Sequence, residues 1–153
     1  MPLNQKEESF IKDLQSQEKL CIQKYERYAN QAKDPELKNL FNYLKDNEQS
    51  HYDALSQILN GESGASALKR CNAADYSPKS TYTNSSCNQD KENDQFLCTD
   101  SIATEKYVST AYNDDLFQFA STDIRQTLNH IQTDEQNHAD MIYKYKSANN
   151  MTQ

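Results

Sequence analysis

Apolar residues recur every three or four positions along four stretches of the chain, which is the spacing of one buried helix face. This pattern predicts helices over about residues 4–33, 35–60, 97–120 and 122–147, and a polar linker over about 61–93. Asp34 and Pro35 suit the start of the second helix, and Gly61 suits its C-terminal cap. Two helical hairpins with a long connection predict an all-α protein: one domain over residues 1–153, folded as an antiparallel four-helix bundle with one crossover.

The two predicted hairpins repeat one another at a shift of 87 positions, counted from Glu48 to Glu135. Glu-Gln-x-His-x-Asp is written at both places, and the shift also aligns Asp34 with Ser121, the predicted caps of the second and fourth helices. These matches fall on polar residues and on the helix break. An internal duplication of one hairpin explains them most economically.

Six ionisable residues interrupt the apolar stripes of the four predicted helices. In each hairpin a Glu lies 30 residues before a Glu-x-x-His motif, and in an antiparallel pair such positions meet at one height. Glu and His three residues apart project from the same helix face. The six residues are Glu18, Glu48, His51, Glu105, Glu135 and His138.

Four carboxylates buried together without compensation would be intolerable, because each costs several kcal/mol, so three interpretations arise. The residues could be exposed helix charges, or a metal-free cluster held by hydrogen bonds and shared protons. They could instead hold two divalent cations, whose charge would balance the carboxylates. One Glu from each of two helices and Glu-x-x-His from the other two is the ligand set of di-iron and di-manganese bundles. Such mixed ligands suit iron, manganese or zinc, and we expect iron or manganese ahead of zinc.

Other polar residues near these positions have less specific interpretations. Tyr25 and Tyr112 lie two turns beyond the upstream Glu residues, either as core tyrosines or as donors to the ligating carboxylates. Asp53 and Asp140 should point away from the cluster, and His130 falls off the stripe and should lie on the surface.

Composition argues against some classes of binding partner and some kinds of metal site. The net charge of −7 makes nucleic acid an unfavourable partner. No apolar run is long enough to cross a bilayer, and no signal peptide is visible, so we expect synthesis in a cytoplasm. The four cysteines form no Cys-x-x-Cys pair, which argues against a zinc-thiolate or rubredoxin-type site and leaves free thiols or cross-links open: Cys21, Cys71, Cys87 and Cys98.

Several segments carry a resemblance to known families. "EKLCIQKYERYANQAKD", followed by "EQSHYDAL", is similar to the first half of rubrerythrin-type ferritin-like proteins, with Glu18 and Glu48-x-x-His51 in the ligand positions. "FLCTDSIATEKYVSTAY" and "LNHIQTDEQNHADMIYKY" resemble clostridial spore coat proteins of the Coat F family. Val108 departs from the rubrerythrin-type pattern, which often has a further Glu there.

The resemblance implies a ferritin-like bundle that is made in the mother cell and deposited in the spore coat. Other coat proteins would be its partners, and a homo-oligomer is left open. We favour a structural coat protein with a dinuclear metal site. The alternative is a catalase- or peroxidase-like oxidoreductase that acts on peroxide, superoxide or oxygen. A third interpretation is a binding module whose polar linker docks coat proteins.

Overall fold

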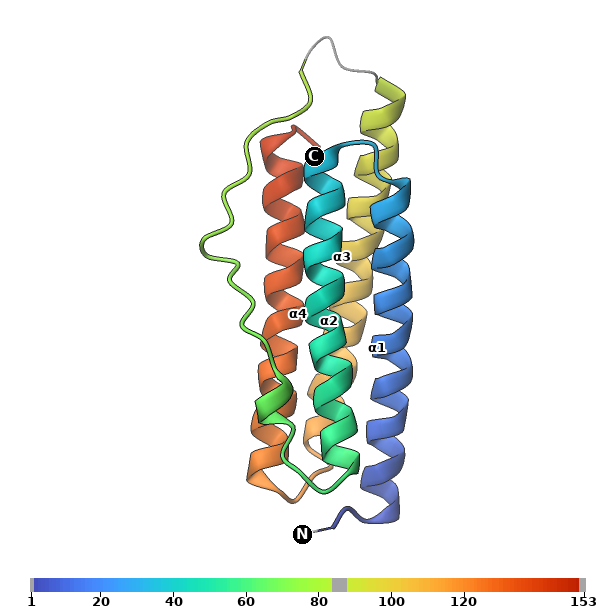
Figure 1. Cartoon of the computed structure of the whole chain (residues 1–153), viewed down its shortest axis with the longest axis vertical. Coiled ribbons are helices and arrows are strands. Elements are labelled where there is room, and N and C mark those ends of the chain that lie inside the picture. Colours follow the sequence, from blue (N-terminus) through green and yellow to red (C-terminus); the bar gives the residue numbers. More distant parts are fainter. Residues whose placement is uncertain (1, 84–87, 152–153) are drawn as a thin grey trace.

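The computed structural model describes residues 2–83 and 88–151. Over these residues it forms four long helices and one short 3-10 helix: α1 (Gln5–Gln31), α2 (Pro35–Leu59), η1 (Ala65–Ala67), α3 (Asn88–Leu116) and α4 (Thr122–Ala148). α1 packs along α2 and α3 along α4, while α2 also contacts α4 and α1 contacts α3. α1 and α4 run upward in Figure 1, and α2 and α3 run downward. The predicted all-α bundle with a crossover is confirmed.

Local caps explain where α1 and α2 begin and where α2 ends. The Asn4 side chain accepts a hydrogen bond from the Glu7 amide at 2.8 Å, and Glu7 accepts one from the Asn4 amide at 3.0 Å. Asp34 caps α2, with Pro35 in its first turn. Gly61, just after α2, has φ +93°, a conformation that favours glycine. These local signals therefore place both ends of α2 within a residue of the prediction.

The predicted start of the third helix is wrong: α3 begins at residue 88 rather than 97, and it ends at 116 rather than 120. Its first nine residues are almost all polar, so no apolar stripe marks them. Asp94 is the buried residue of this turn, and it accepts hydrogen bonds from the backbone amides of Lys33 and Asp34, both at 2.9 Å. Polar contacts therefore hold a helical turn that apolar periodicity does not detect.

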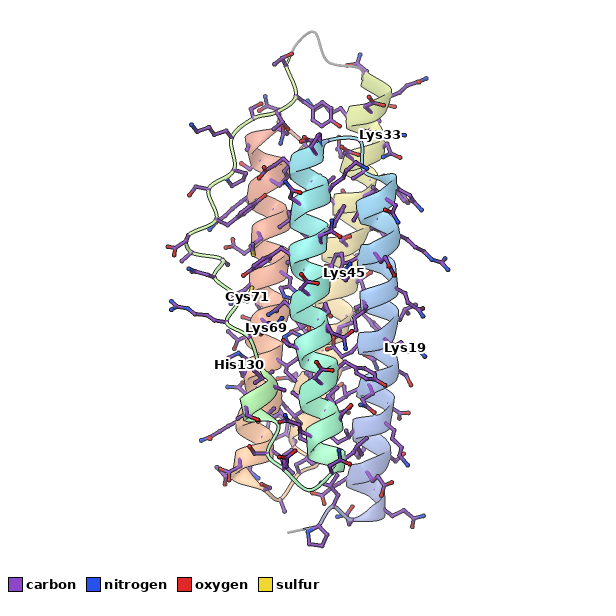
Figure 2. The ribbon with its side chains drawn as sticks, viewed as in Figure 1. Lys19, Lys33, Lys45, Lys69, Cys71 and His130 are labelled. Atoms are coloured by element: carbon purple, nitrogen blue, oxygen red, sulfur yellow. The ribbon has the colours of Figure 1, made fainter. Side chains whose placement is uncertain are left out.

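The linker between α2 and α3 runs back along the outside of the bundle (Figure 1). Gly64 lets it turn close to α2, because a Cβ there would lie 2.7 Å from the Ala54 carbonyl oxygen. Cys71 and Ala73 of the linker are buried against the bundle. Figure 2 labels Cys71 beside Lys69 on this side of the molecule. The linker is thus partly packed, and it brings its residues near the middle of α2 and α4.

Two apolar clusters fill the bundle, one at each end. The upper cluster gathers the end of α1, the start of α2, the start of α3 and the end of α4, with Phe41, Leu44 and Ile142 among its fully buried residues. The lower cluster gathers the opposite ends, with Leu55 and Leu128 in its centre. The six predicted ionisable residues belong to neither cluster. They occupy the layer between them.

No helix of the described residues is long and apolar enough to cross a membrane. Cys21, Cys71 and Cys98 are buried free thiols. Cys87 lies outside the described residues.

Candidate metal centre

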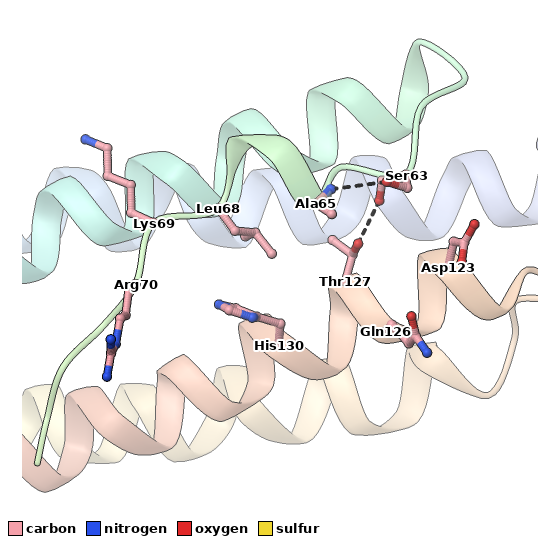
Figure 3. Close-up of a pocket in the computed structure, with 9 residues that line it drawn as sticks. All are labelled: Ser63, Ala65, Leu68, Lys69, Arg70, Asp123, Gln126, Thr127 and His130. Carbon is pink, nitrogen blue, oxygen red and sulfur yellow. Dashed lines mark hydrogen bonds between the residues drawn. The ribbon is translucent and has the colours of Figure 1, made fainter.

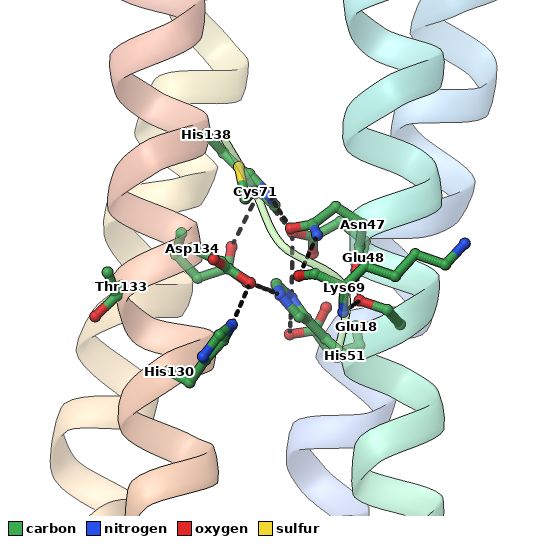
Figure 4. A network of polar contacts seen from close by, with 12 residues as sticks. Glu18, Asn47, Glu48, His51, Lys69, Cys71, His130, Thr133, Asp134 and His138 are labelled. Atoms are coloured by element: carbon green, nitrogen blue, oxygen red, sulfur yellow. Dashed lines mark hydrogen bonds and ion pairs between the residues drawn. The ribbon is translucent and has the colours of Figure 1, made fainter. Parts of the chain in front are cut away.

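All six predicted ionisable residues converge in the middle of the bundle, most of them visible in Figure 4. None is more than 2 % exposed. The interpretation as exposed helix charges is therefore wrong, because each helix turns its interrupting residue inward with the rest of its stripe. One Glu comes from α1, one from α3, and a Glu and a His from each of α2 and α4.

The side chains form two overlapping groups that could each hold one metal ion. In each group, one atom from every residue lies within 4.8 Å of the others. Glu48 and Glu135 belong to both groups, so their carboxylates lie between the two positions. The groups are Glu18, Glu48, His51 and Glu135, and Glu48, Glu105, Glu135 and His138. Carboxylate oxygens with one imidazole per position fit iron, manganese or zinc.

Both imidazoles present Nδ1 to the carboxylates. His51 Nδ1 lies 3.1 Å from Glu135 Oε1 and 3.6 Å from Glu48 Oε1. His138 Nδ1 lies 2.7 Å from Glu48 Oε1 and 3.2 Å from Glu105 Oε1. The rings stack with centroids 5.7 Å apart and planes 16° from parallel. The nitrogen of each ring that faces the centre is therefore the one available to a metal.

The outer nitrogens contact two residues that the sequence analysis missed, Asn47 and Asp134. His51 Nε2 lies 2.8 Å from Asp134 Oδ2, and His138 Nε2 lies 2.6 Å from Asn47 Oδ1. Both partners are acceptors, so each Nε2 carries the proton and each Nδ1 keeps a lone pair when the ring is neutral. A signal existed: each partner directly precedes a motif Glu, and the two are related by the same shift of 87 (47 to 134).

Two tyrosines reach the same carboxylates across the bundle. Tyr112 donates a hydrogen bond to Glu18 Oε1 at 2.6 Å, and Tyr25 donates one to Glu105 Oε1. Each tyrosine therefore holds the upstream Glu of the opposite hairpin. Of the two interpretations from the sequence, contact with the candidate ligands is the one that the geometry favours.

Most of the carboxylate oxygens in the cluster have no hydrogen-bond partner. Among the described residues, this holds for one oxygen each of Glu18 and Glu105 and for both oxygens of Glu48 and Glu135. The short contact of His138 Nδ1 with Glu48 is an ion pair without hydrogen-bond geometry. Buried polar atoms are ordinarily satisfied, so six such oxygens in one place require compensation by protons or by cations.

Comparison with known families supports the same classification from both halves of the chain. Residues 3–59 match the rubrerythrin family model, and residues 93–153 match the model described as Coat F domain. The chain is thus similar to rubrerythrin in its first hairpin and to the Coat F domain in its second. No curated protein and no solved structure matches it significantly. The rubrerythrin match covers α1 and α2 and agrees with a ferritin-like helical bundle, as predicted.

Electrostatics divide the four carboxyl groups of the cluster into two pairs. Burial raises the pKa of Glu48 and Glu135 well above the ordinary value, and the Glu18 and Glu105 carboxylates beside them raise it further. Burial acts in the same direction on Glu18 and Glu105, but the charge of the neighbouring imidazoles and the hydrogen bonds to these carboxylates together outweigh it and lower the pKa of both. The two shared carboxyls therefore favour the protonated form in the absence of metal.

The imidazoles respond in the opposite way. Burial lowers the pKa of an imidazole, but the charge of Glu18, the contact with Asp134 and the charge of Glu48 together outweigh it and raise the pKa of His51 to about 10. Glu105 and Glu48 likewise raise the pKa of His138 well above its ordinary value. Without metal, two protonated carboxyls and two imidazolium rings can thus balance two carboxylates. Metal binding would exchange these protons for cations.

The remaining predicted surface residues lie where expected. Asp53 and Asp140 are exposed, and His130 is 47 % exposed in its side chain. His130 lines an open pocket of about 550 Å³ between the linker and α4, together with Lys69 and Arg70 (Figure 3). Its Nε2 also lies 3.5 Å from Asp134 Oδ2, so this pocket touches the outer edge of the cluster.

Proposed function

We propose that this chain is a structural protein of the spore coat whose bundle is tied together by a dinuclear metal centre. The Coat F match to residues 93–153 supports the location, and it makes other coat proteins the expected partners. The buried cluster supports the metal centre. Its six residues come from all four helices, so bound metal would join both hairpins directly.

One observation carries the metal centre: four fully buried carboxylates whose six free oxygens face one another. Four carboxylates carry four negative charges, and two divalent ions carry four positive ones. The site is therefore neutral with two metals and neutral imidazoles. Burial of this many charges without such compensation would cost several kcal/mol for each ion.

The residues divide naturally by role. Glu48 and Glu135 would bridge the two ions, because their oxygens lie within reach of both positions. Glu18 and Glu105 would each bind one ion, and the hydroxyls of Tyr112 and Tyr25 would hold them in place. This arrangement fits iron, manganese or zinc by its ligands, with iron or manganese preferred.

An oxidoreductase is the second candidate, because the N-terminal hairpin matches rubrerythrin and the ligand set is the one of redox-active pairs. Such a pair of metals would supply the electrons for reduction of peroxide, superoxide or oxygen. Val108, where rubrerythrin-type proteins often have another Glu, is 2 % exposed and packs in the lower apolar cluster. This chain therefore lacks that extra ligand, which favours the structural function.

Thermal unfolding with and without metal tests the proposal. A ligand that binds only the folded chain at about 1,000 times its Kd adds about 4 kcal/mol to the free energy of unfolding. We expect Mn²⁺ or Fe²⁺ to raise Tm by many degrees, a chelator to reverse this, and Glu48→Ala to abolish it. The exposed Glu62→Ala provides a matched control. An identical Tm with metal and with chelator would contradict the proposal.

The two candidate functions separate in a second assay on the same samples. The structural function predicts that the metal-loaded chain stays folded and consumes hydrogen peroxide no faster than free metal ions. Turnover of peroxide that depends on Glu48 would instead establish the oxidoreductase. Fractionation of spores from a sporulating host tests the location, since we expect the chain in the coat extract rather than in the core.

A further inference from the structure

The two candidate metal positions are not equivalent, because the residues behind their imidazoles differ. Asn47 and Asp134 occupy corresponding positions in the two hairpins, and each contacts the imidazole of the opposite hairpin. They are 4 % and 3 % exposed. A carboxylate thus stands behind His51, whereas a neutral amide stands behind His138.

A contact with the linker determines which atom of the Asn47 side chain faces the imidazole. The Asn47 amide nitrogen donates to the Lys69 carbonyl oxygen at 3.4 Å, so its carbonyl oxygen is the atom that faces His138. A carboxylate at position 47 would place an oxygen against the Lys69 carbonyl oxygen. Among the described residues, the side-chain contacts of Asp134 are with His51 and His130. His130, half exposed, lies 3.5 Å from Asp134 Oδ2 on the outer side.

The charged ligands of the two positions correspond, although His138 Nδ1 lies 3.2 Å from Glu105 Oε1 while His51 Nδ1 lies 3.7 Å from Glu18 Oε1. Glu48 and Glu135 serve both positions, and the Glu that completes each position accepts a tyrosine hydroxyl. The carboxylate behind one ring is therefore the main electrostatic difference between them. A carboxylate that accepts the outer N–H of a ligating imidazole makes the ring a stronger donor, and loss of such a partner typically costs 10–100-fold in metal affinity.

We propose that Asp134 makes the metal position beside His51 the tighter of the two, so that the centre fills in two distinct steps. This inference rests on the proposed metal centre. The first ion would bind with Glu18 and His51, and the second would complete the pair with Glu105 and His138. Asp134 acts as a positioning residue, because it reaches the metal only through the imidazole.

Mn²⁺ titration followed by electron paramagnetic resonance measures the two steps directly. A lone Mn²⁺ gives a six-line signal, and two ions that share bridging carboxylates give a coupled signal. With one equivalent of Mn²⁺, we expect mainly the six-line signal of a protein-bound ion. The coupled signal should dominate only after the second equivalent, and calorimetry should resolve two dissociation constants at least 10-fold apart.

Asp134→Asn makes the two positions alike. We expect it to weaken the first step 10- to 100-fold and to leave the second step nearly unchanged. The coupled signal should then appear at a lower ratio of Mn²⁺ to protein. Asp140→Asn removes the same charge from the exposed face of α4 and should change neither step. Asn47→Asp provides the opposite test, because it should tighten the second step while the fold is monitored by circular dichroism.

The outcomes separate this inference from the proposed function. Two steps of equal affinity in the unmodified chain, or a first step that Asp134→Asn leaves unchanged, would overturn the inference while the metal centre stands. Failure of the unmodified chain to bind any Mn²⁺ would overturn both.

Discussion

Two groups of buried carboxylates lie in this bundle, one in the middle and one at its upper end, and they are built in opposite ways. The upper pair, Asp34 and Asp94, is surrounded by donors from the chain itself. Asp94 accepts the backbone amides of Lys33 and Asp34 and the hydroxyl of Tyr82 at 2.5 Å. Asp34 accepts the Glu36 amide, the Tyr145 hydroxyl and Thr81. The central four carboxylates have six oxygens without any hydrogen-bond partner.

This difference separates two roles that a buried carboxylate can have. At the upper end each oxygen ties a loop or a helix end to the bundle, so the group is complete in the folded chain. In the middle the carboxylates face one another, and the chain supplies two imidazoles and two hydroxyls for four acids. Hydrogen bonds from the chain itself therefore stabilise the Asp34–Asp94 pair, whereas the four central carboxyl groups need protons or metal ions to be stable.

Removal of the Asp94 carboxylate should have the largest effect on stability. Asp94→Ala leaves four donors without their acceptor, because the Asn93 side-chain amide also donates to Asp94, and each buried donor left unsatisfied costs about 1–3 kcal/mol. We expect the free energy of unfolding to fall by about 3 kcal/mol or more in urea denaturation, equally with metal and with chelator. Exposed Glu92→Ala, on the same helix, should stay within about 0.5 kcal/mol. A loss of stability that metal reverses would contradict the distinction between the Asp34–Asp94 pair and the four central carboxyl groups.

A change in the central cluster should have opposite signs in the two metal states. In the chelated chain burial raises the pKa of Glu48, so this carboxyl must take up a proton on folding at pH 8; Glu48→Gln removes that cost and should stabilise the chelated chain by about 1 kcal/mol. The same change removes a shared ligand and should lower the stability of the metal-loaded chain. Chemical denaturation of both forms at pH 8 measures this crossover. Destabilisation of equal size in both forms would show that Glu48 is an ordinary structural carboxylate.

The pH dependence of stability provides a third comparison. In the chelated chain the pKa of His51 is raised from 6.5 to about 10, so the folded state holds a proton that the unfolded state releases between these values. The contribution of His51 is therefore complete below pH 6.5 and is lost as the pH rises toward 10. The raised pKa values of Glu48 and Glu135 act in the same direction.

We thus expect the chelated chain to lose stability from pH 6.5 to 9.5, whereas metal affinity should rise over the same range because the ligands lose their protons. Urea denaturation at several pH values, with chelator and with Mn²⁺, measures both slopes. Parallel slopes in the two conditions would contradict the account.

The smallest effect concerns the tyrosines. Tyr112→Phe removes one hydrogen bond to Glu18, which contributes about 1.5–3 kcal/mol for a charged acceptor. We expect a loss near the lower end of this range and a weaker first metal step. Tyr107→Phe, on an exposed ring of the same helix, is the control. Equal behaviour of the two variants would show that the hydroxyl does not hold the carboxylate.

The sequence predicts the central carboxyl groups better than the Asp34–Asp94 pair, for a physical reason. Glu18 and Glu48 interrupt long apolar stripes, and helical periodicity alone brings such residues to one height. Asn47 and Asp134 escape this reasoning because their partners are in the other hairpin. Asp94 escapes it because it lies in a polar turn without a stripe. Periodicity thus finds residues that share a face, but it does not find contacts that depend on how two hairpins meet.

Metal content tests the central claim most directly. The chain and its Glu48→Ala variant are reconstituted with Mn²⁺, passed through a desalting column and measured by elemental analysis against protein concentration. The account predicts two ions per chain in the unmodified protein, with fewer than one in the variant. A folded, unmodified chain that retains no metal would contradict it, and the central carboxylates would then be held by protons alone.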